Sequence, residues 1–460
     1  MTVTPPPEWV RPDLDPGLLR QHTYTSRRRR HLVDVSALLS LMIATLFLVP
    51  SVLGAPQMST VGRPAHLVGA VLAVAWLATR AHPDLAVRGP QPMRVAVAIW
   101  LVTLLLSYAA GQGRGLTDAE ARSTDLIMLY LLIFCGVVLA CADGIASRER
   151  LGRVVRVLVW SAAGMAVIGL LQALADVDLA EYLVLPGLEF RQELVGLQQR
   201  AGFHRIASTT GHFIEFSAVM AVTLPFAVHL ARFGDTRLVR QMAIVCGLLI
   251  ASVIPLTLSR TGILAVLATF LVMLPLWSWR VRFNLVALAL GLVALAILAR
   301  PRLMGTLRSL FTNWESDNSI QGRTNRYDAV LEYVRERPLL GRGPGTFLPD
   351  QYLLLDNQWL ATLVSNGVVG VIGLVIVHGV AATLAVATIR QATTPQDRHL
   401  AGCLLAAQVI AVIAAGTFDS FAFTTFTTTI AICTGLTAAL WRLSHPRRSV
   451  RTASSRLGRA

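Results

Sequence analysis

Several polar groups interrupt the apolar runs of this sequence, and their types suit acid–base chemistry and anion binding. His212 and Glu215 lie three residues apart, so their side chains share one helix face and are candidates for proton transfer. Helix capping or simple hydrogen bonding is the alternative interpretation of the pair. Arg260 lies between two apolar runs with almost no loop, where a charge is costly unless it is paired or hydrated. It either extends to the membrane interface or forms the cationic wall of a site that opens outward.

A concentration of arginine lies in the long polar stretch 300–358. Guanidinium groups bind phosphate oxygens through paired hydrogen bonds and remain charged. The stretch therefore predicts a site for a phosphorylated ligand, while salt bridges with Asp328, Glu332 and Glu336 are the alternative for part of the group. The arginines are Arg300, Arg302, Arg308, Arg323, Arg326, Arg335, Arg337 and Arg342.

One segment of this stretch has helical periodicity. Tyr327, Val330, Leu331 and Val334 recur at helical spacing, which predicts a short amphipathic helix that ends before Pro338. The glycines of the segment 341–345 indicate a tight turn. We do not interpret it as a nucleotide-binding loop, because no strand precedes it and no helix start clearly follows.

Composition indicates the environment in which these residues must work. The 460 residues are 54% hydrophobic and only 15% charged, and all 41 basic residues are arginine. The net charge of +15 resides in short clusters between apolar runs, which is typical of a membrane protein and argues against a nucleic-acid partner. The five cysteines fall inside apolar runs without metal-ligand spacing, so we expect buried thiols and neither a disulfide nor a metal site.

Run lengths predict an all-α polytopic membrane protein, because about 20 apolar residues span a bilayer as a helix. The tenth run is long enough to contain a bend near Gly367 or Gly370. The twelve expected spans are Leu32–Leu53, Ala65–Thr79, Val95–Ala110, Leu126–Ala142, Val157–Ala175, Phe213–Ala231, Gln241–Leu258, Thr261–Trp277, Phe283–Ala299, Trp359–Ile389, Leu400–Phe418 and Phe421–Trp441.

Arginine counts predict the orientation. With both termini in the cytoplasm, 26 of the 41 arginines lie on the cytoplasmic side. We therefore expect a multi-pass protein of the cell membrane, with a membrane domain at 32–441 between basic cytoplasmic tails at 1–31 and 442–460. The extracytoplasmic loops are then 176–212 and 300–358. The arginine run at 27–30 fits a role in orienting the first span, with lipid or nucleic-acid binding as the alternative.

Four stretches together make the chain resemble the O-antigen ligase/polymerase family of bacterial membrane glycosyltransferases. A fifth segment, Asp356–Gly370, is similar to the family's pattern of a His-Asn pair followed by spaced leucines. The resemblance covers residues 205–370, and the first five spans match only in hydropathy. The four stretches are Arg205–Glu215 (RIASTTGHFIE), Ser259–Gly262 (SRTG), Gly322–Tyr327 (GRTNRY) and Arg337–Phe347 (RPLLGRGPGTF).

The resemblance implies transfer of a glycan from a polyprenyl-pyrophosphate carrier to an acceptor glycan or lipid on the outer face of the membrane. It also implies an architecture like that of C-type glycosyltransferases, with a large late external loop. Arg260 and Arg323 fall at the family's pyrophosphate-binding arginines, and Arg326 lies beside the second. Guanidinium charges can stabilise the leaving pyrophosphate, so no metal or cofactor is expected.

One departure from the family pattern concerns the general base. Asp356 stands where ligases of the family have histidine, and it either takes the acceptor proton or orients another base such as His212. This departure favours a polymerase of capsule or exopolysaccharide repeat units over a ligase. The supporting residues that the motifs suggest are Arg205, Tyr327, Asn357 and Asp419.

Two functions of other classes compete with this interpretation. A flippase or exporter of lipid-linked oligosaccharides would have two similar halves with charges along a pathway, but the sequence has no evident repeat. A membrane scaffold would leave the external arginines unexplained. The partners expected for the transferase are the lipid-linked donor, the acceptor, the bilayer and other membrane proteins of polysaccharide assembly.

Overall fold

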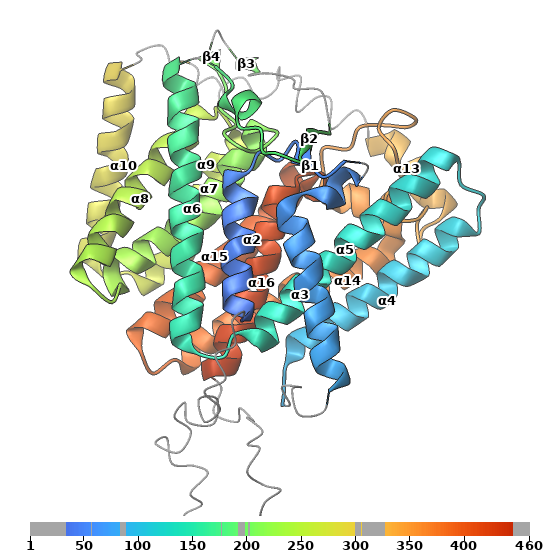
Figure 1. Cartoon of the computed structure of the whole chain (residues 1–460), viewed down its shortest axis with the longest axis horizontal. Helices are drawn as coiled ribbons and strands as arrows, with labels where there is room; N and C mark the ends of the chain where they lie inside the picture. Colours follow the sequence, from blue (N-terminus) through green and yellow to red (C-terminus); the bar gives the residue numbers. More distant parts are fainter. Residues whose placement is uncertain are drawn as a thin grey trace, which may run out of the picture.

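Apolar runs of the sequence form helices that pack side by side (Figure 1). The computed structural model describes residues 34–56, 58–82, 89–175, 177–191, 198–200, 203–299, 305 and 327–444. The α-helices are α2 (Val35–Leu48), α3 (Pro64–Ala81), α4 (Pro92–Gln112), α5 (Asp118–Gly144), α6 (Arg148–Ala175), α7 (Phe213–Phe233), α8 (Arg237–Leu256), α9 (Arg260–Met273), α10 (Trp279–Ala299), α13 (Tyr327–Glu336), α14 (Gln358–Gln391), α15 (Pro395–Thr417) and α16 (Thr424–Ser444).

Short elements lie in the connections between these helices. Strand β1 pairs antiparallel with β2, with Leu53 opposite Phe190, and β3 pairs with β4, with Gln199 opposite His204. The strands are β1 (Leu53–Gly54), β2 (Glu189–Phe190), β3 (Gln199–Arg200) and β4 (Phe203–His204), and the 3-10 helices are η2 (Ser59–Gly62), η3 (Leu179–Tyr182), η4 (Leu274–Leu276) and η5 (Ser420–Ala422).

Side chains that accept hydrogen bonds from free backbone N–H groups define the starts of several helices. Asp34 caps α2, and Thr117 forms a capping box with Glu120 at the start of α5. Thr236 and Thr394 cap α8 and α15 in the same way. Polar residues between apolar runs therefore set where these helices begin.

Helix α16 is the centre of the bundle. Its apolar window is 100% buried, and it contacts α5, α7, α14 and α15. The helix is rich in threonine, and the hydroxyls of Thr429 and Thr437 donate to the carbonyls of Thr425 and Cys433 four residues earlier. These local bonds satisfy polar groups in a position that water does not reach.

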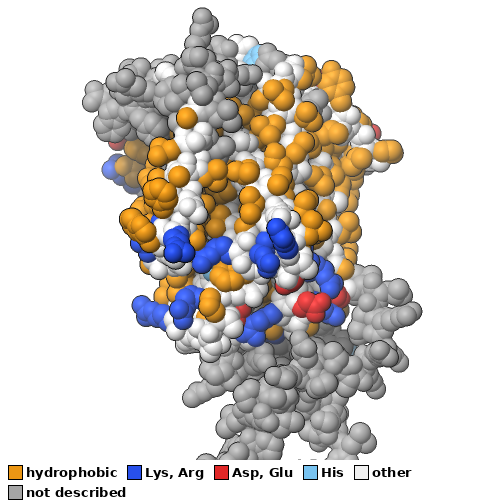
Figure 2. Space-filling model, turned by 90° about the vertical axis from the view of Figure 1, so that its left-hand side faces the viewer, with side chains coloured by type: hydrophobic (Ala, Val, Ile, Leu, Met, Phe, Trp, Pro, Cys, Tyr) orange, Lys and Arg blue, Asp and Glu red, His pale blue; other side chains and the backbone are white. Residues whose placement is uncertain are grey.

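Successive helices run in alternating directions, so the bundle has two distinct ends (Figure 1). We call the end that carries β1–β4 and α13 the loop end. The opposite end, where α2 begins and α16 finishes, is the termini end. Figure 2 shows one face of the molecule, on which arginine side chains form a band toward the termini end below a largely hydrophobic surface.

Within the part of the chain that the structure describes, nine helices are long and apolar enough to cross a membrane: α3 to α8 and α14 to α16. Helices α2 and α9 are apolar but shorter. The structure thus agrees with an all-α polytopic membrane protein and places a helix in each of the twelve apolar runs. The count of twelve crossings is not confirmed.

The prediction that the first span continues as a helix to Leu53 was wrong. Helix α2 stops at Leu48, because Val49 has the extended backbone that a following proline favours, and Pro50 cannot continue the helical bonding. The end of the same apolar run forms strand β1. A similar change occurs after α9, where Pro275 lies in η4.

Candidate functional site

The predicted bend in α14 is present at Gly367. Its backbone angles are φ 65° and ψ −172°, a conformation that favours glycine. In an unbroken helix, the N–H groups of Val368 and Val369 would donate to the carbonyls of Val364 and Ser365. The break releases these four backbone groups, which then need other partners.

The Gly-rich turn and the residues directly before it supply all four partners. The carbonyls of Pro338 and Leu339 accept from the two released N–H groups at 2.9 and 3.2 Å, and the N–H groups of Arg342 and Gly343 donate to the two released carbonyls at 3.0 and 2.8 Å. Gly341 has a φ of +68°, and a Cβ there would come within 2.5 Å of the α14 backbone. The predicted tight turn therefore fixes the end of the long loop against the broken helix.

Helix α13 is the predicted amphipathic helix, and it packs beside this turn. Val330 is buried and Val334 is partly buried against residues near the start of α14. Tyr327 and Leu331, which the sequence pattern placed on the same apolar face, are 39% and 43% exposed. The buried face of α13 therefore includes Tyr333, whose ring contacts that of Phe347.

Arg342 confirms the salt-bridge alternative for one arginine of the loop. Its guanidinium contacts Glu336 and the hydroxyl of Tyr352, both at 3.0 Å. The Tyr352 hydroxyl donates to Glu120 at 2.8 Å, and Arg114 binds the same Glu120 oxygen at 2.5 Å. This network joins the Gly-rich turn to the loop between α4 and α5, so Arg342 serves the fold.

Arg260 is the first residue of α9, and its side chain is half-buried. The preceding turn spans only residues 257–259, as the sequence predicted. The hydroxyl of Thr261 donates to that of Thr417 at 3.1 Å, which ties the start of α9 to the end of α15. A Cβ on Gly262 would come within 2.6 Å of Ser217, so α9 also packs closely on α7.

Arg205 contacts the turn that precedes Arg260. Its Nε donates to the carbonyl of Thr257 at 3.1 Å, and its Nη2 donates to the carbonyl of Leu258 at 2.8 Å. The guanidinium also lies over the ring of Phe213, 3.1 Å from the ring centre. The RIASTTGHFIE motif therefore contacts the two residues that directly precede the SRTG motif.

Asp356 and Asp419 come from segments that are joined by hydrogen bonds. Asn357 caps α14 through Leu360, and the N–H of the next residue, Gln358, donates to the carbonyl of Phe418 at 3.3 Å. The Gln358 side chain also accepts from the N–H of Phe421 at 2.7 Å. Burial, together with the negative charge of Asp356, raises the pKa of Asp419 to about 7.

His212 caps α7, with its Nδ1 accepting from the N–H of Ile214 at 3.2 Å. Its ring contacts the rings of Phe213 and Phe423. Burial lowers the pKa of His212 to about 4, and the charge of Arg205 acts in the same direction. The imidazole is therefore neutral at physiological pH, with Nδ1 occupied as an acceptor.

Glu215 is buried and caps a different helix. One carboxylate oxygen accepts from the N–H groups of Thr425 and Phe426, at 2.6 and 3.0 Å, in the first turn of α16. The structure thus agrees with the capping alternative for both His212 and Glu215, and it does not test the proton-transfer alternative.

Arg63 is a buried arginine that sequence reasoning missed. It donates to the hydroxyls of Thr424 and Thr425 at 2.5 and 3.2 Å, so it meets the same end of α16 as Glu215. Burial lowers the pKa of Arg63, and the charge of Glu215 opposes this effect. The only signal in the sequence was an isolated arginine before Pro64, between two apolar runs.

Some predicted site residues lie outside the described part of the chain. These include Arg323 and Arg326, the second and third predicted pyrophosphate ligands, as well as the arginine run at 27–30. Arg335 and Arg337 are described and exposed, and neither forms an ion pair with another described residue. Arg260, Arg205, His212, Asp356 and Asp419 all lie at the loop end.

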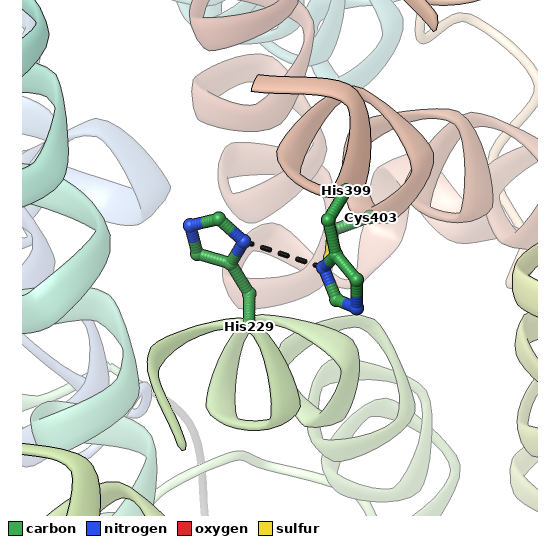
Figure 3. Close-up of side chains that lie close together, drawn as sticks. All are labelled: His229, His399 and Cys403. Carbon is green, nitrogen blue, oxygen red and sulfur yellow. Dashed lines mark hydrogen bonds between the residues drawn. The ribbon is translucent and has the colours of Figure 1, made fainter. Parts of the chain in front are cut away.

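A second polar cluster lies deep in the bundle near the termini end. Figure 3 shows the side chains of His229, His399 and Cys403 close together. The atoms with which they could bind a metal lie within 4.8 Å of one another. The two Nδ1 atoms are 3.3 Å apart, and the Cys403 sulfur is 3.6 Å from Nδ1 of His399. Distances of this size would suit a tetrahedral metal ion.

The hydrogen-bond partners of these side chains indicate where their protons lie, and they favour a hydrogen-bonded network over a metal site. The indole N–H of Trp277, which can only donate, points to Nε2 of His399 at 2.9 Å. A neutral His399 then carries its proton on Nδ1, facing His229, whereas a metal ligand at Nδ1 would carry it on Nε2 against the indole. The Cys403 thiol donates to the carbonyl of Pro225. We therefore assign no metal to these residues.

The comparison with known families concerns part of the loop-end site, including Arg260 and Asp356. The family model described as O-antigen ligase matches residues 245–375. The matched segment includes the α8–α9 turn with Arg260, helix α13, the Gly-rich turn and the broken start of α14. Among curated proteins, none matches the chain.

Proposed function

The chain belongs to the O-antigen ligase family through residues 245–375, and we propose that it transfers a glycan from a polyprenyl-pyrophosphate carrier to an acceptor glycan or lipid. We further propose that the loop end faces the outside of the cell membrane and that both termini lie in the cytoplasm. The arginine band at the termini end supports this orientation (Figure 2).

The observation that carries the proposal is the position of Arg260 and Asp356 around one turn. Thr261, next to Arg260, contacts Thr417 at the end of α15. Gln358, two residues after Asp356, binds both sides of the turn that follows α15. A cation and a carboxylate thus flank the same polar turn, at the end of the bundle where a lipid-linked substrate would approach.

Arg260 is assigned to the leaving group, and Arg323 and Arg326 are assigned with it. The acceptor oxygen forms a bond to the anomeric carbon while the bond from that carbon to the pyrophosphate oxygen breaks. The electron pair leaves with the pyrophosphate, so negative charge develops on its oxygen. A fixed guanidinium close to that oxygen lowers the barrier.

Asp356 is assigned as the base that takes the proton of the acceptor hydroxyl. A carboxylate that is held within reach of a reacting hydroxyl can take its proton. Asp419 lies in the neighbouring turn, and burial, together with the negative charge of Asp356, raises its pKa to about 7. The other candidates fit less well, because Nδ1 of His212 is occupied and Glu215 caps α16.

Among the reactions of this class, we favour polymerisation of capsule or exopolysaccharide repeat units over ligation. The reason is the aspartate at position 356, where ligases of the family have histidine. Tyr327 and Asn357 are assigned supporting roles, the first beside the arginine motif and the second as the cap that orients the start of α14.

The lipid-linked glycans of a deletion strain test this proposal, with chain length and membrane leaflet resolved. Single repeat units on the outer leaflet are the expected result for a polymerase. Long lipid-linked chains on the outer leaflet would identify a ligase instead. Units trapped on the inner leaflet would identify a flippase and would contradict the catalytic assignment of Arg260.

A further inference from the structure

The turn between α8 and α9 holds Arg260 in place, and its backbone is under strain. Leu258 has a φ of 50°, which is unfavourable for a residue with a Cβ. The hydroxyl of Ser259 is buried and has no hydrogen-bond partner among the described residues. Such a conformation persists only where surrounding contacts maintain it.

Arg205 provides these contacts. Its two donors reach the consecutive carbonyls of Thr257 and Leu258, which the end of α8 leaves without helical partners. Stacking on Phe213 fixes the plane of the guanidinium. A fork of two donors on a fixed plane determines the direction of both carbonyls, which a single ammonium group cannot do.

We propose that Arg205 is a positioning residue, which acts on pyrophosphate binding through the α8–α9 turn and Arg260 rather than by contact with substrate. This inference rests on the proposed function, because it assumes that Arg260 binds the pyrophosphate. It explains why the RIASTTGHFIE segment and the SRTG segment occur together. The first segment carries Arg205, and the second directly follows the two residues that Arg205 binds and carries Arg260.

The test is a double-mutant cycle on the full-length protein in detergent, with undecaprenyl pyrophosphate as the binding probe. Arg205→Ala is expected to weaken probe binding by about 10- to 100-fold, because misplacement of a binding group by about 1 Å has effects of this size. Arg205→Lys should recover little of the loss. The double variant Arg205→Ala/Arg260→Ala should bind no worse than Arg260→Ala alone.

Arg191→Ala is the matched control. Arg191 is another loop-end arginine whose guanidinium donates to a backbone carbonyl, that of Ser51, but it does not contact the α8–α9 turn. This variant should bind the probe as the wild type does. If Arg205→Ala does not fold, Phe213→Leu removes only the stacking contact and should weaken binding in the same direction.

Each other outcome has a definite meaning. Additive losses in the double variant would indicate that Arg205 acts independently of Arg260, and they would overturn the inference. Unchanged binding in Arg205→Ala, with a loss in Arg260→Ala, would also overturn it while leaving the proposed function intact. Unchanged binding in Arg260→Ala would instead reject the proposed pyrophosphate site itself.

Discussion

Charged residues are arranged differently at the two ends of the bundle. At the termini end, Asp143 is buried and receives Arg80 at 2.6 Å, Arg94 at 2.8 Å and the indole N–H of Trp76 at 3.0 Å. Arg442 is also buried there, and it donates to two backbone carbonyls at the end of α5. Opposite charges and donor–acceptor pairs match, so this end stabilises the fold.

The loop end contains unfavourable arrangements. Burial and the negative charge of Asp356 raise the pKa of Asp419, and the backbones of Ser208, Leu258 and Gly367 adopt positive φ angles. Strained backbones and perturbed carboxylates cluster at functional sites, where binding or chemistry depends on them. The loop end also has ion pairs, those of Arg342 with Glu336 and of Arg114 with Glu120. What distinguishes it is the raised pKa of a buried carboxyl together with strained turns, and these features favour it as the reactive end.

The largest effect is expected from Arg260→Ala at the loop end. Loss of the cation beside the leaving group should reduce glycan transfer by about 100- to 1,000-fold, with little change in thermal stability. Transfer is measured as polyprenyl pyrophosphate released by the purified protein. Arg335→Ala, on the exposed face of α13, is the control and should retain near wild-type transfer. Equal loss in both variants would mean that loop charge in general, and not Arg260, matters.

Gly367→Ala tests whether the strained break in α14 is essential. A Cβ at this position would lie 2.1 Å from the carbonyl oxygen of Leu339, in addition to requiring a positive φ. We expect the free energy of unfolding to fall by about 3 kcal/mol or more. Gly379→Ala, in the same helix with open space around it, should have little effect. Similar thermal unfolding of the two variants would show that the break is not specified by Gly367.

Asp143→Asn tests the termini end. Removal of the charge that two arginines share should reduce the free energy of unfolding by about 2 kcal/mol, because charge-assisted hydrogen bonds contribute on this scale. Transfer activity per folded molecule should stay unchanged. A selective loss of activity, with unfolding temperature preserved, would argue against a purely structural termini end.

The raised pKa of Asp419 predicts opposite pH trends for activity and stability. Transfer should increase as the pH rises through about 7, because Asp419 then loses its proton and becomes a charged neighbour of Asp356, the proposed base. The folded pKa lies above the ordinary value of 3.8, so the stabilising contribution is fully present below that value and is lost as the pH rises through about 7. In Asp419→Asn, the rise of the transfer rate near pH 7 and the loss of stability near pH 7 should both disappear. A rate step retained in that variant would reassign the base.

The smallest effect is expected in the His229–His399–Cys403 cluster. Trp277→Phe removes one buried hydrogen bond to His399 and should cost about 1 kcal/mol of stability. A zinc chelator should leave the unfolding temperature of the wild type unchanged. A clear decrease after chelation would mean that these residues hold a metal ion.

Much of the fold follows from local patterns in the sequence. Run length located a helix in each apolar segment, and the glycines at positions 367 and 370 indicated a bend in α14, which the structure places at Gly367. The i, i+3, i+4 spacing located α13, and the apolar surroundings of the cysteines indicated that they are buried and free. These features depend on residues close together in the chain.

Contacts between residues far apart in the sequence could not be predicted from these local patterns. Glu215 caps a helix that begins more than 200 residues later. Arg63, near the start of the chain, binds the same end of that helix. The contact of Arg205 with the α8–α9 turn is of the same kind. The sequence singled out positions 205 and 215, but only the packing of α7, α8 and α16 shows what these side chains bind.

The most direct test of the account uses proteoliposomes with a polyprenyl-pyrophosphate-linked glycan supplied only to the loop-end face. Cleavage of the donor, with glycan transferred to the acceptor and polyprenyl pyrophosphate left on the same face, is the predicted result. The appearance of intact donor on the opposite face, without cleavage, would contradict the account and identify a transporter.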